Sequence, residues 1–312
     1  MIFPEGPECT CSWSRACPER PQESYGLQPC TKGQESAALA AEVSGRFAYD
    51  STKRYSLTAP ILELRNVSYR VNAKNILSGV TLGLRAGEVL ALLGESGAGK
   101  TTVLRLANRL LTESAGEVLV QNRAAREWDV IALRRQMGYV VQDTGLFPHY
   151  SVARNVSLIP RLLGHTKQQA AARTDEMLRL VGLEPNDFRR RYPHELSGGQ
   201  RQRVGVARAL AGDPPILLMD EPFGALDPLT RVELQQEFKK LQARLQKPVV
   251  LVTHDLREAL FLGTSVCLMD AGKIVTLCSP QEFLRSADPR VQAYVQAFRA
   301  NDPFAREAGG VN

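Results

Sequence analysis

The chain has 312 residues, 44% of them hydrophobic, which is enough for one large domain or two small ones with a buried core. Its formal net charge of +6 suits a nucleotide or a membrane surface but is too weak to indicate nucleic-acid binding, so we expect no nucleic-acid partner. No apolar run approaches the ~18 residues that span a bilayer, and the N-terminus lacks the pattern of a signal peptide. These features predict a cytosolic protein unless a partner holds it at a membrane.

The N-terminal segment differs in composition from the rest of the chain. Residues 1–55 are rich in Pro, Glu, Ser, Gly and Gln and have no sustained periodicity, apart from a short helical pattern over residues 36–43. This composition predicts a disordered extension. A mistaken start site in the gene would give the same appearance.

The six cysteines fall into two groups. Two lie in apolar, strand-like segments and are interpreted as small buried hydrophobes: Cys267 and Cys278. The other four lie in the N-terminal extension: Cys9, Cys11, Cys17 and Cys30. Their spacing lacks the paired C-x-x-C of a zinc site, so we expect free thiols rather than a metal cluster.

The folded domain is expected to span residues 56–300. Its first part contains short alternating segments at residues 61–64 and 80–84, which predict an antiparallel strand layer. The apolar run at residues 88–93 has the composition and length of a buried strand, and residues 103–111 carry apolar side chains at helical spacing. A glycine-rich loop connects this strand to this helix.

The loop matches the phosphate-binding pattern G-x-x-x-x-G-K-[ST]. Its residues are Gly94, Glu95, Ser96, Gly97, Ala98, Gly99, Lys100, Thr101 and Thr102. Glycines allow backbone N–H groups to turn inward around an anion, and the helix N-terminus adds a favourable dipole. Lys100 can reach the outer phosphates, and the hydroxyl of Thr101 can hold Mg²⁺. The alternative, a glycine turn with a chance lysine, is disfavoured by the strand and helix on either side.

The next segment contains two strands and then only helices. Residues 117–120 and 138–142 predict strands, with a short helix over residues 129–136 between them. Three helices follow at residues 151–158, 168–181 and 197–211. A block of helices in a chain that otherwise alternates strands and helices predicts an inserted helical subdomain over about residues 145–211.

Alternation then resumes. Strands are predicted at residues 216–219 and 249–253, helices at 229–245, 256–262, 280–285 and 290–299, and a hairpin at 265–269 and 273–277. Residues 301–312 are expected to form a tail. The predicted fold class is α/β: a P-loop NTPase core with a mixed, mainly parallel sheet, an antiparallel β layer and the helical subdomain.

Two acids, Asp220 and Glu221, directly follow the apolar run at residues 216–219. The carboxyl end of a buried parallel strand is where such sheets place their ligands. Asp220 would meet the Mg²⁺ held by Thr101, and Glu221 would orient and deprotonate a water in line with the terminal phosphate. Without the phosphate loop, two loop acids that cap the next helix would be the better interpretation.

A second anion-binding helix start is predicted after Leu196. The residues are Ser197, Gly198, Gly199 and Gln200. Ser197 has the side chain of an N-cap, and the two glycines leave backbone N–H groups unobstructed. Short runs of serine and glycine occur in many loops, so this run alone is weak evidence for a binding site.

Taken together, these motifs resemble the ATP-binding cassette ATPases in order and spacing, from about Ile61 to Phe298. The motifs are residues 94–102, Gln142, residues 196–200, Asp220 and Glu221, residues 225–227 and His254. The run Leu-Ser-Gly-Gly-Gln at residues 196–200 is nearly exclusive to that family.

The resemblance implies ATP hydrolysis with Mg²⁺ and assigns roles to single residues. Gln142 matches the glutamine that touches Mg²⁺ or the attacking water, Asp227 the aspartate that crosses the dimer interface, and His254 the histidine that contacts the terminal phosphate. In this family two subunits sandwich ATP head to tail, so Ser197 to Gln200 would complete the site of a second copy. A homodimer is therefore expected.

One position departs from the family pattern. Cassettes usually stack adenine on an aromatic side chain at the position that is Val71 here. Tyr69 lies two residues earlier on the same predicted strand face. Either Tyr69 takes over this contact or the stacking is lost.

The segment after Gln142 resembles the surface that importer cassettes present to a separate membrane permease, which Phe147 to His149 would contact. Residues 134–142, 191–195 and 220–231 look most like importers of glycine betaine, choline and related osmoprotectants. This implies a peripheral subunit at the cytoplasmic face of the membrane that serves a solute-binding protein indirectly. Many such chains continue into a pair of regulatory modules after the cassette. We do not expect these modules here, because the sequence up to Asn312 leaves no room for them.

Three other functions remain open from the motifs. Amino-acid importers carry a similar segment after the glutamine. A soluble cassette that acts on ribosomes or DNA would normally have two cassettes or a coiled-coil insertion. A non-catalytic nucleotide sensor would tolerate the loss of Glu221 or His254, and both are present.

Overall fold

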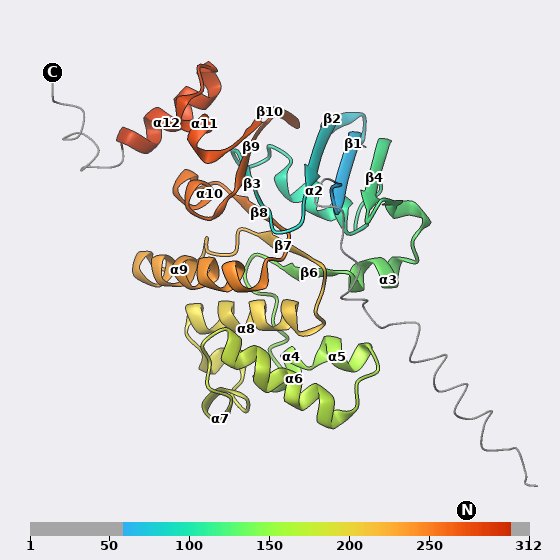
Figure 1. Cartoon of the computed structure of the whole chain (residues 1–312), viewed down its shortest axis with the longest axis vertical. Coiled ribbons are helices and arrows are strands. Elements are labelled where there is room, and N and C mark those ends of the chain that lie inside the picture. Colours follow the sequence, from blue (N-terminus) through green and yellow to red (C-terminus); the bar gives the residue numbers. More distant parts are fainter. Residues whose placement is uncertain (1–58, 301–312) are drawn as a thin grey trace, which may run out of the picture. The chain divides into compact units, whose positions relative to one another are not determined.

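The computed structural model describes residues 59–300 of the chain (Figure 1). The predicted extension at residues 1–55, its short helix and its four cysteines lie outside the described residues, as does the tail at 301–312.

An antiparallel sheet forms the first layer, with the strand order β2-β1-β4-β5 (Figure 1). Its strands are β1 (Leu62–Val71), β2 (Lys74–Leu84), β4 (Ala115–Val120) and β5 (Arg123–Ala124). The two strands predicted at 61–64 and 80–84 are longer than expected, because they continue to a two-residue turn. Asn72 and Ala73 both have positive φ there, 44° and 66°, as a hairpin turn that matches the strand twist requires.

The second sheet is mixed and mainly parallel, with the order β10-β9-β3-β8-β7-β6. Its strands are β3 (Val89–Leu93), β6 (Met137–Val140), β7 (Ile216–Asp220), β8 (Val249–Thr253), β9 (Ser265–Asp270) and β10 (Lys273–Cys278). Only β10 runs antiparallel to its neighbour. Because the other five strands are parallel, the residues that follow β3, β6, β7 and β8 meet at one edge of the sheet.

Helices cover both faces of this sheet. Their bounds are α2 (Lys100–Ala107), α3 (Val130–Arg135), α4 (Val152–Val156), α5 (Leu158–Leu162), α6 (Lys167–Leu180), α7 (Pro185–Phe188), α8 (Gly198–Ala211), α9 (Pro228–Leu245), α10 (Leu256–Leu262), α11 (Pro280–Arg285) and α12 (Pro289–Ala300). Short 3₁₀ turns lie at Ala125–Glu127 and Pro193–Glu195. Helices α4 to α8 lie together, with α8 between α6 and α9 (Figure 1).

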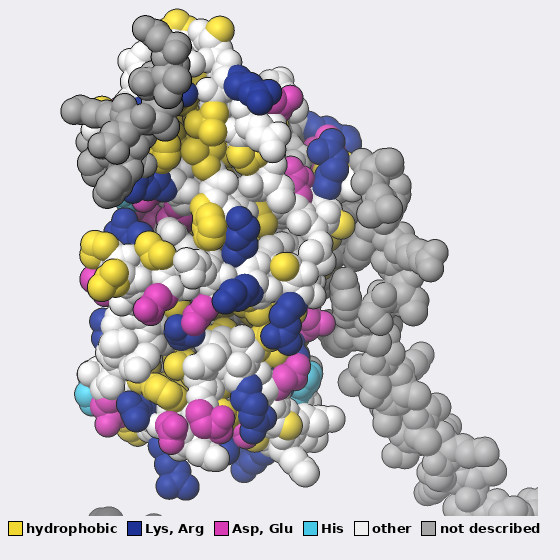
Figure 2. Space-filling model, turned by 60° about the vertical axis from the view of Figure 1, so that its left-hand side comes forward, with side chains coloured by type: hydrophobic (Ala, Val, Ile, Leu, Met, Phe, Trp, Pro, Cys, Tyr) yellow, Lys and Arg dark blue, Asp and Glu magenta, His cyan; other side chains and the backbone are white. Residues whose placement is uncertain are grey.

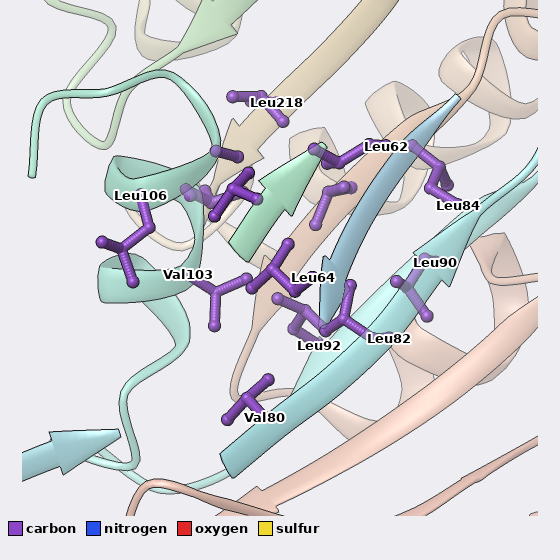
Figure 3. Close-up of a cluster of buried hydrophobic side chains, with 14 of the residues drawn as sticks. Leu62, Leu64, Val80, Leu82, Leu84, Leu90, Leu92, Val103, Leu106 and Leu218 are labelled. Atoms are coloured by element: carbon purple, nitrogen blue, oxygen red, sulfur yellow. The ribbon is translucent and has the colours of Figure 1, made fainter. Parts of the chain in front are cut away.

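The core lies on both sides of the mixed sheet. On one side, leucines of β3 and leucines and valines of β1 and β2 form one buried cluster with Val103 and Leu106 of α2 (Figure 3). This packing fixes α2, and with it the phosphate loop, against the end of β3. On the other side, β7 and β8 pack against α8 and α9. Alternate residues of β3 face a third cluster with α10, α11 and α12.

The surface carries charges of both signs. Figure 2 shows acidic and basic side chains interspersed on one face, with hydrophobic side chains in several separate patches. No helix among residues 59–300 has the length and apolar character needed to cross a membrane.

The main features of the predicted fold class are confirmed, but some boundaries were wrong. The helix predicted to reach residue 111 ends at Ala107, because Asn108 turns its side chain to accept a hydrogen bond from Leu110 N at 3.1 Å and Arg109 takes a φ of 52°. The helix predicted over 151–158 is divided into α4, which ends at Val156, and α5, which begins at Leu158, because Pro160 has no N–H to donate to Val156 O.

Two smaller corrections concern single residues. The predicted strand 138–142 ends at Val140, so Gln142 follows the strand rather than belonging to it. Cys267 is buried as expected, whereas Cys278, at the end of the edge strand β10, is only half-buried. The bounds of the helical subdomain, about 145–211, stay a prediction.

Candidate nucleotide-binding site

The phosphate loop follows β3 and runs directly into α2. Gly99 is the N-cap of α2 and has a φ of 99°, a conformation that favours glycine. No side chain caps this helix, and among residues 59–300 the backbone N–H groups of Lys100, Thr101 and Thr102 have no acceptor. An uncapped helix N-terminus below a glycine turn is a preformed cradle for an anion.

Lys100 places a buried cation inside this cradle. Its Nζ donates to the carbonyl oxygens of Gly94 and Glu95, at 2.7 and 2.8 Å. Burial lowers the pKa of Lys100, and the nearby carboxylates of Glu221 and Asp220 oppose this effect. Within the described part of the chain, the ammonium group bonds only neutral carbonyl oxygens, so its position and its positive charge allow it to pair with phosphate oxygens.

Thr101 and Asp220 form a hydrogen-bonded pair across the loop and β7. The hydroxyl of Thr101 donates to Asp220 Oδ1 at 2.9 Å. The hydroxyl of Tyr139, on β6, donates to Asp220 Oδ2 at 3.4 Å. Asp220 is only 8% exposed, and burial raises its pKa while these two hydrogen bonds oppose the rise.

These oxygens fit a Mg²⁺ ion, which takes hard oxygen ligands and is bound by one or two carboxylates together with substrate phosphates. The Thr101 hydroxyl and the Asp220 carboxylate lie next to the anion cradle and offer ligands of this kind. Tyr139 was missed by the sequence analysis, because only the pairing of β6 with β7 brings it to Asp220. Burial and the charge of Asp220 raise the pKa of Tyr139 to about 12, so it stays a hydrogen-bond donor.

Glu221 and His254 meet at the same edge of the sheet. His254 follows β8, and its Nδ1 lies 3.1 Å from Glu221 Oε2. The side chain of His254 is 57% exposed and that of Glu221 20%. Glu221 has a φ of 45°, which costs a non-glycine residue about 1–2 kcal/mol, and its N–H is held by Val252 O at 3.0 Å. Strain of this kind is common where a side chain must face a ligand.

The run Ser197 to Gln200 opens α8 as predicted. Ser197 Oγ accepts from Gln200 N at 3.2 Å, and Gln200 Oε1 accepts from Ser197 N at 3.0 Å. This reciprocal capping box fixes the turn that presents Gly198 and Gly199. Among the described residues, no hydrogen bond joins this run to the phosphate loop.

Among the described residues, Gln142 and Asp227 make no hydrogen bond to Asp220 or Glu221. Gln142 precedes Asp143 and Thr144, whose positive φ values of 61° and 64° turn the chain away from β6. Asp227 caps α9, because its Oδ1 accepts from Thr230 N at 3.1 Å, and this bond lowers the pKa of Asp227. A cavity of about 170 Å³ is lined by Glu221 together with Asp143, Thr144, Gly198 and Leu226, among others.

The two candidates for the adenine contact lie on β1. Tyr69 is half-buried and packs against the hydrophobic core, whereas Val71 is 43% exposed at the strand end. Part of the Tyr69 ring is therefore already in contact with the protein.

The site and the fold define a P-loop nucleotide-binding protein. The pattern of the family described as ABC transporter matches residues 77–224. The glycine betaine uptake system ATP-binding protein YehX of Escherichia coli (strain K12) is 47% identical over 224 residues, which cover 72% of each chain. The chain belongs to the ABC transporter family, as the motifs predicted.

Other relatives agree with this assignment. The choline transport ATP-binding protein OpuBA of Bacillus subtilis (strain 168) is 47% identical over 75% of this chain. The chain spans 62% of the length of that relative. A solved dimer of the ATP-binding cassette MJ0796 bound to ADP and Pi has a TM-score of 0.63 and 33% identity, covering 70% of this chain and 98% of that one.

Proposed function

We propose that this chain is the ATP-hydrolysing subunit of a membrane importer that takes up an osmoprotectant or quaternary amine. The observation that carries the proposal is the pair Glu221–His254, 3.1 Å apart beside the Thr101–Asp220 pair. It lies in a chain that is 47% identical to a glycine betaine uptake ATP-binding protein over 72% of each sequence.

The phosphate loop binds the phosphates of ATP in this proposal. Gly94 to Thr102 surround them with backbone N–H groups, and Lys100 pairs with the outer phosphates. Thr101 and Asp220 would hold Mg²⁺, with Gln142 as a further ligand. When bound, the ion neutralises charge on the phosphate oxygens. Tyr69 is the proposed adenine contact, because the exposed Val71 offers no aromatic ring.

Glu221 is the proposed general base. A carboxylate with one oxygen held by His254 keeps the other oxygen available to accept a proton from the attacking water. The strained backbone of Glu221 directs its side chain away from the sheet, toward the cavity it shares with Gly198. His254 holds this carboxylate and contacts the terminal phosphate.

A second copy of the chain would complete the site. Ser197, Gly198, Gly199 and Gln200 of one copy would bind the ATP held by the phosphate loop of the other. Asp227 would lie at the interface between them. The solved dimer of the ATP-binding cassette MJ0796 bound to ADP and Pi supports this arrangement.

The proposed permease contact is an aromatic surface cluster after Gln142. Phe147 is 40% exposed, and its ring centroid lies 6.0 Å from that of His149 and 5.3 Å from that of Tyr150. Asn155 is fully buried and holds the backbone of Phe147 on both sides, at 2.8 Å to its N–H and 3.2 Å to its carbonyl oxygen. A rigid aromatic cluster of this kind suits docking to a membrane partner at the cytoplasmic face, with a solute-binding protein served indirectly.

The test combines turnover and uptake. The purified chain should release phosphate from ATP, and Glu221→Gln should bind ATP normally but release almost none. Cells of the source organism that lack the gene should lose uptake of labelled glycine betaine, choline, carnitine or proline. The wild-type gene should restore that uptake and Glu221→Gln should not. Loss of amino-acid or sulfate uptake instead would contradict the solute class, and full turnover by Glu221→Gln would contradict the base.

A further inference from the structure

We propose that Arg231 is a positioning residue for the ATPase reaction. Its guanidinium group connects the turn of residues 221–227, which carries Glu221, to the acid that follows His254. This inference rests on the proposed function, since it concerns the alignment of the same two groups.

Arg231 lies in the first turn of α9 and reaches back over the turn that precedes the helix. Its Nη2 donates to the carbonyl oxygens of Gly224 and Leu226, each at 3.2 Å. Both carbonyls belong to residues between Glu221 and Asp227. One nitrogen of the guanidinium therefore holds the middle and the end of this turn.

The other terminal nitrogen faces the segment that carries His254. Arg231 Nη1 lies 3.8 Å from Asp255 Oδ2. Asp255 is itself held firmly: its Oδ1 caps α10 by accepting from Arg257 N at 2.8 Å, and its own N–H donates to Thr253 Oγ1 at 3.0 Å. Arg231 thus pairs with an acid whose position is set by β8 and α10.

The contacts require the planar fork of arginine. A guanidinium group presents several donors in fixed directions, whereas lysine is a compact point charge on a flexible stem. Lysine at position 231 could keep the attraction to Asp255 but could not bond both carbonyls and the acid in the same geometry.

A buried acid lies in the same neighbourhood. Glu258 of α10 is 4% exposed and interacts electrostatically with Arg231 and Asp255. Glu258 Oε1 and Arg231 Nε are both buried without a hydrogen-bond partner among the described residues. Arg231 Nε is therefore a donor without a partner near a carboxyl group of α10, and the positive charge of Arg231 opposes the rise in the pKa of Glu258.

Besides the backbone hydrogen bond from Glu221 N to Val252 O, two side-chain connections therefore join the turn of residues 221–227 to the segment that carries His254. One is the hydrogen bond between Glu221 and His254, and the other is the set of contacts made by Arg231. The first connection is weak alone, because His254 is exposed and the turn of 221–227 includes a glycine. Without Arg231 the turn can shift relative to His254, and misplacement of a catalytic group by about 1 Å costs up to roughly 10²-fold in rate.

The test compares three variants of the full-length chain. Arg231→Met should lower kcat about 10- to 100-fold with a change in KM for ATP of less than about threefold, because the phosphate loop belongs to β3 and α2. Arg231→Lys should recover only part of this loss. The matched control is Arg173→Met: Arg173 also donates to two backbone carbonyls, Leu210 O at 3.2 Å and Ala211 O at 3.1 Å, and pairs with acids, but on α6.

A purely structural role for Arg231 makes different predictions. In that case Arg231→Met would lower the melting temperature and the fraction of protein that binds nucleotide, but kcat per bound nucleotide would be unchanged. Arg173→Met would show the same changes as Arg231→Met. Either that result or wild-type kcat in Arg231→Met would overturn the inference while leaving the proposed function standing. Absence of turnover in the wild-type chain would instead count against the proposed function itself.

Discussion

Glu221 Oε2 and His254 Nδ1 lie 3.1 Å apart, although the two residues come from the ends of different strands. Strands β7 and β8 are parallel neighbours, so their carboxyl ends deliver an acid and an imidazole to the same point. Imidazole Nδ1–H donates to the carboxylate when Glu221 is ionised. The two side chains therefore act as one unit.

Removal of His254 should reduce turnover without preventing ATP binding. His254→Ala is expected to lower kcat about 100-fold or more, because Glu221 loses the bond that orients it. In the Glu221→Gln background, His254→Ala should lower kcat little further, since the effects of substitutions at residues that act as a unit are not additive. Phosphate release and binding of a fluorescent ATP analogue measure the two effects. The control is His194→Ala, an exposed histidine stacked on Tyr192. Full additivity would disprove the coupling.

Removal of the Thr101 hydroxyl should damage both stability and Mg²⁺-dependent nucleotide binding. Thr101→Val keeps the shape but leaves Asp220, 8% exposed, without its 2.9 Å donor. An unsatisfied buried acceptor costs about 1–3 kcal/mol. Thr101→Ser retains the hydroxyl and serves as the matched control. Denaturant unfolding and ATP binding with and without Mg²⁺ measure the result; equal behaviour of the two variants would contradict it.

Two alanine substitutions in the phosphate loop should differ in severity. Gly97 has a φ of 85° and open space around an added Cβ, so Gly97→Ala should lose only about 1–2 kcal/mol from backbone strain. At Gly99, with a φ of 99°, an added Cβ would lie 2.5 Å from Leu77 Cδ2, and Leu77 is fully buried. Gly99→Ala should therefore lower the melting temperature and ATP affinity further. A reversed order would show that the loop rearranges.

Glu258 should make stability depend on pH. Burial, with a contribution from Asp255, raises the pKa of Glu258 from 4.5 to about 8. Between these two values the native state keeps a proton that the unfolded state has lost, so stability falls as pH rises through this window and levels off above it. Glu258→Gln removes this dependence. Its stability relative to wild type should rise by about 1 kcal/mol per pH unit between pH 5 and 8.

Urea unfolding at several pH values measures this difference. Glu233→Gln, at an exposed position of α9, controls for the loss of one negative charge. Parallel stability curves for wild type and Glu258→Gln would show that the acid is ionised in the native protein.

The parts of the site that come from contiguous residues were predictable. The loop between β3 and α2 is fixed by a local pattern of glycines, and Asp220, Glu221 and His254 follow apolar runs that had to be parallel strands. Strand ends of a parallel sheet meet at one edge, so the convergence of these side chains could be anticipated from the sequence.

The parts that depend on distant partners were not predictable. Tyr139 lies in a predicted strand, and only the pairing of β6 with β7 brings its hydroxyl to Asp220. Arg231 lies in the predicted helix at 229–245, and nothing in the sequence indicates which carbonyls its side chain will reach. The end of α2 was missed since a helical pattern continues past Ala107, while the side chain of Asn108 competes for the backbone.

In the proposed dimer, the capping box at Ser197 and Gln200 would affect the thermodynamics of association. Because each residue of the box bonds the other within one chain, the turn gives up its conformational entropy when the chain folds. A partner subunit that carries nucleotide would then meet a turn that is already ordered. Less free energy is lost to ordering on contact, and preorganised surfaces of this kind associate more tightly for the same buried area.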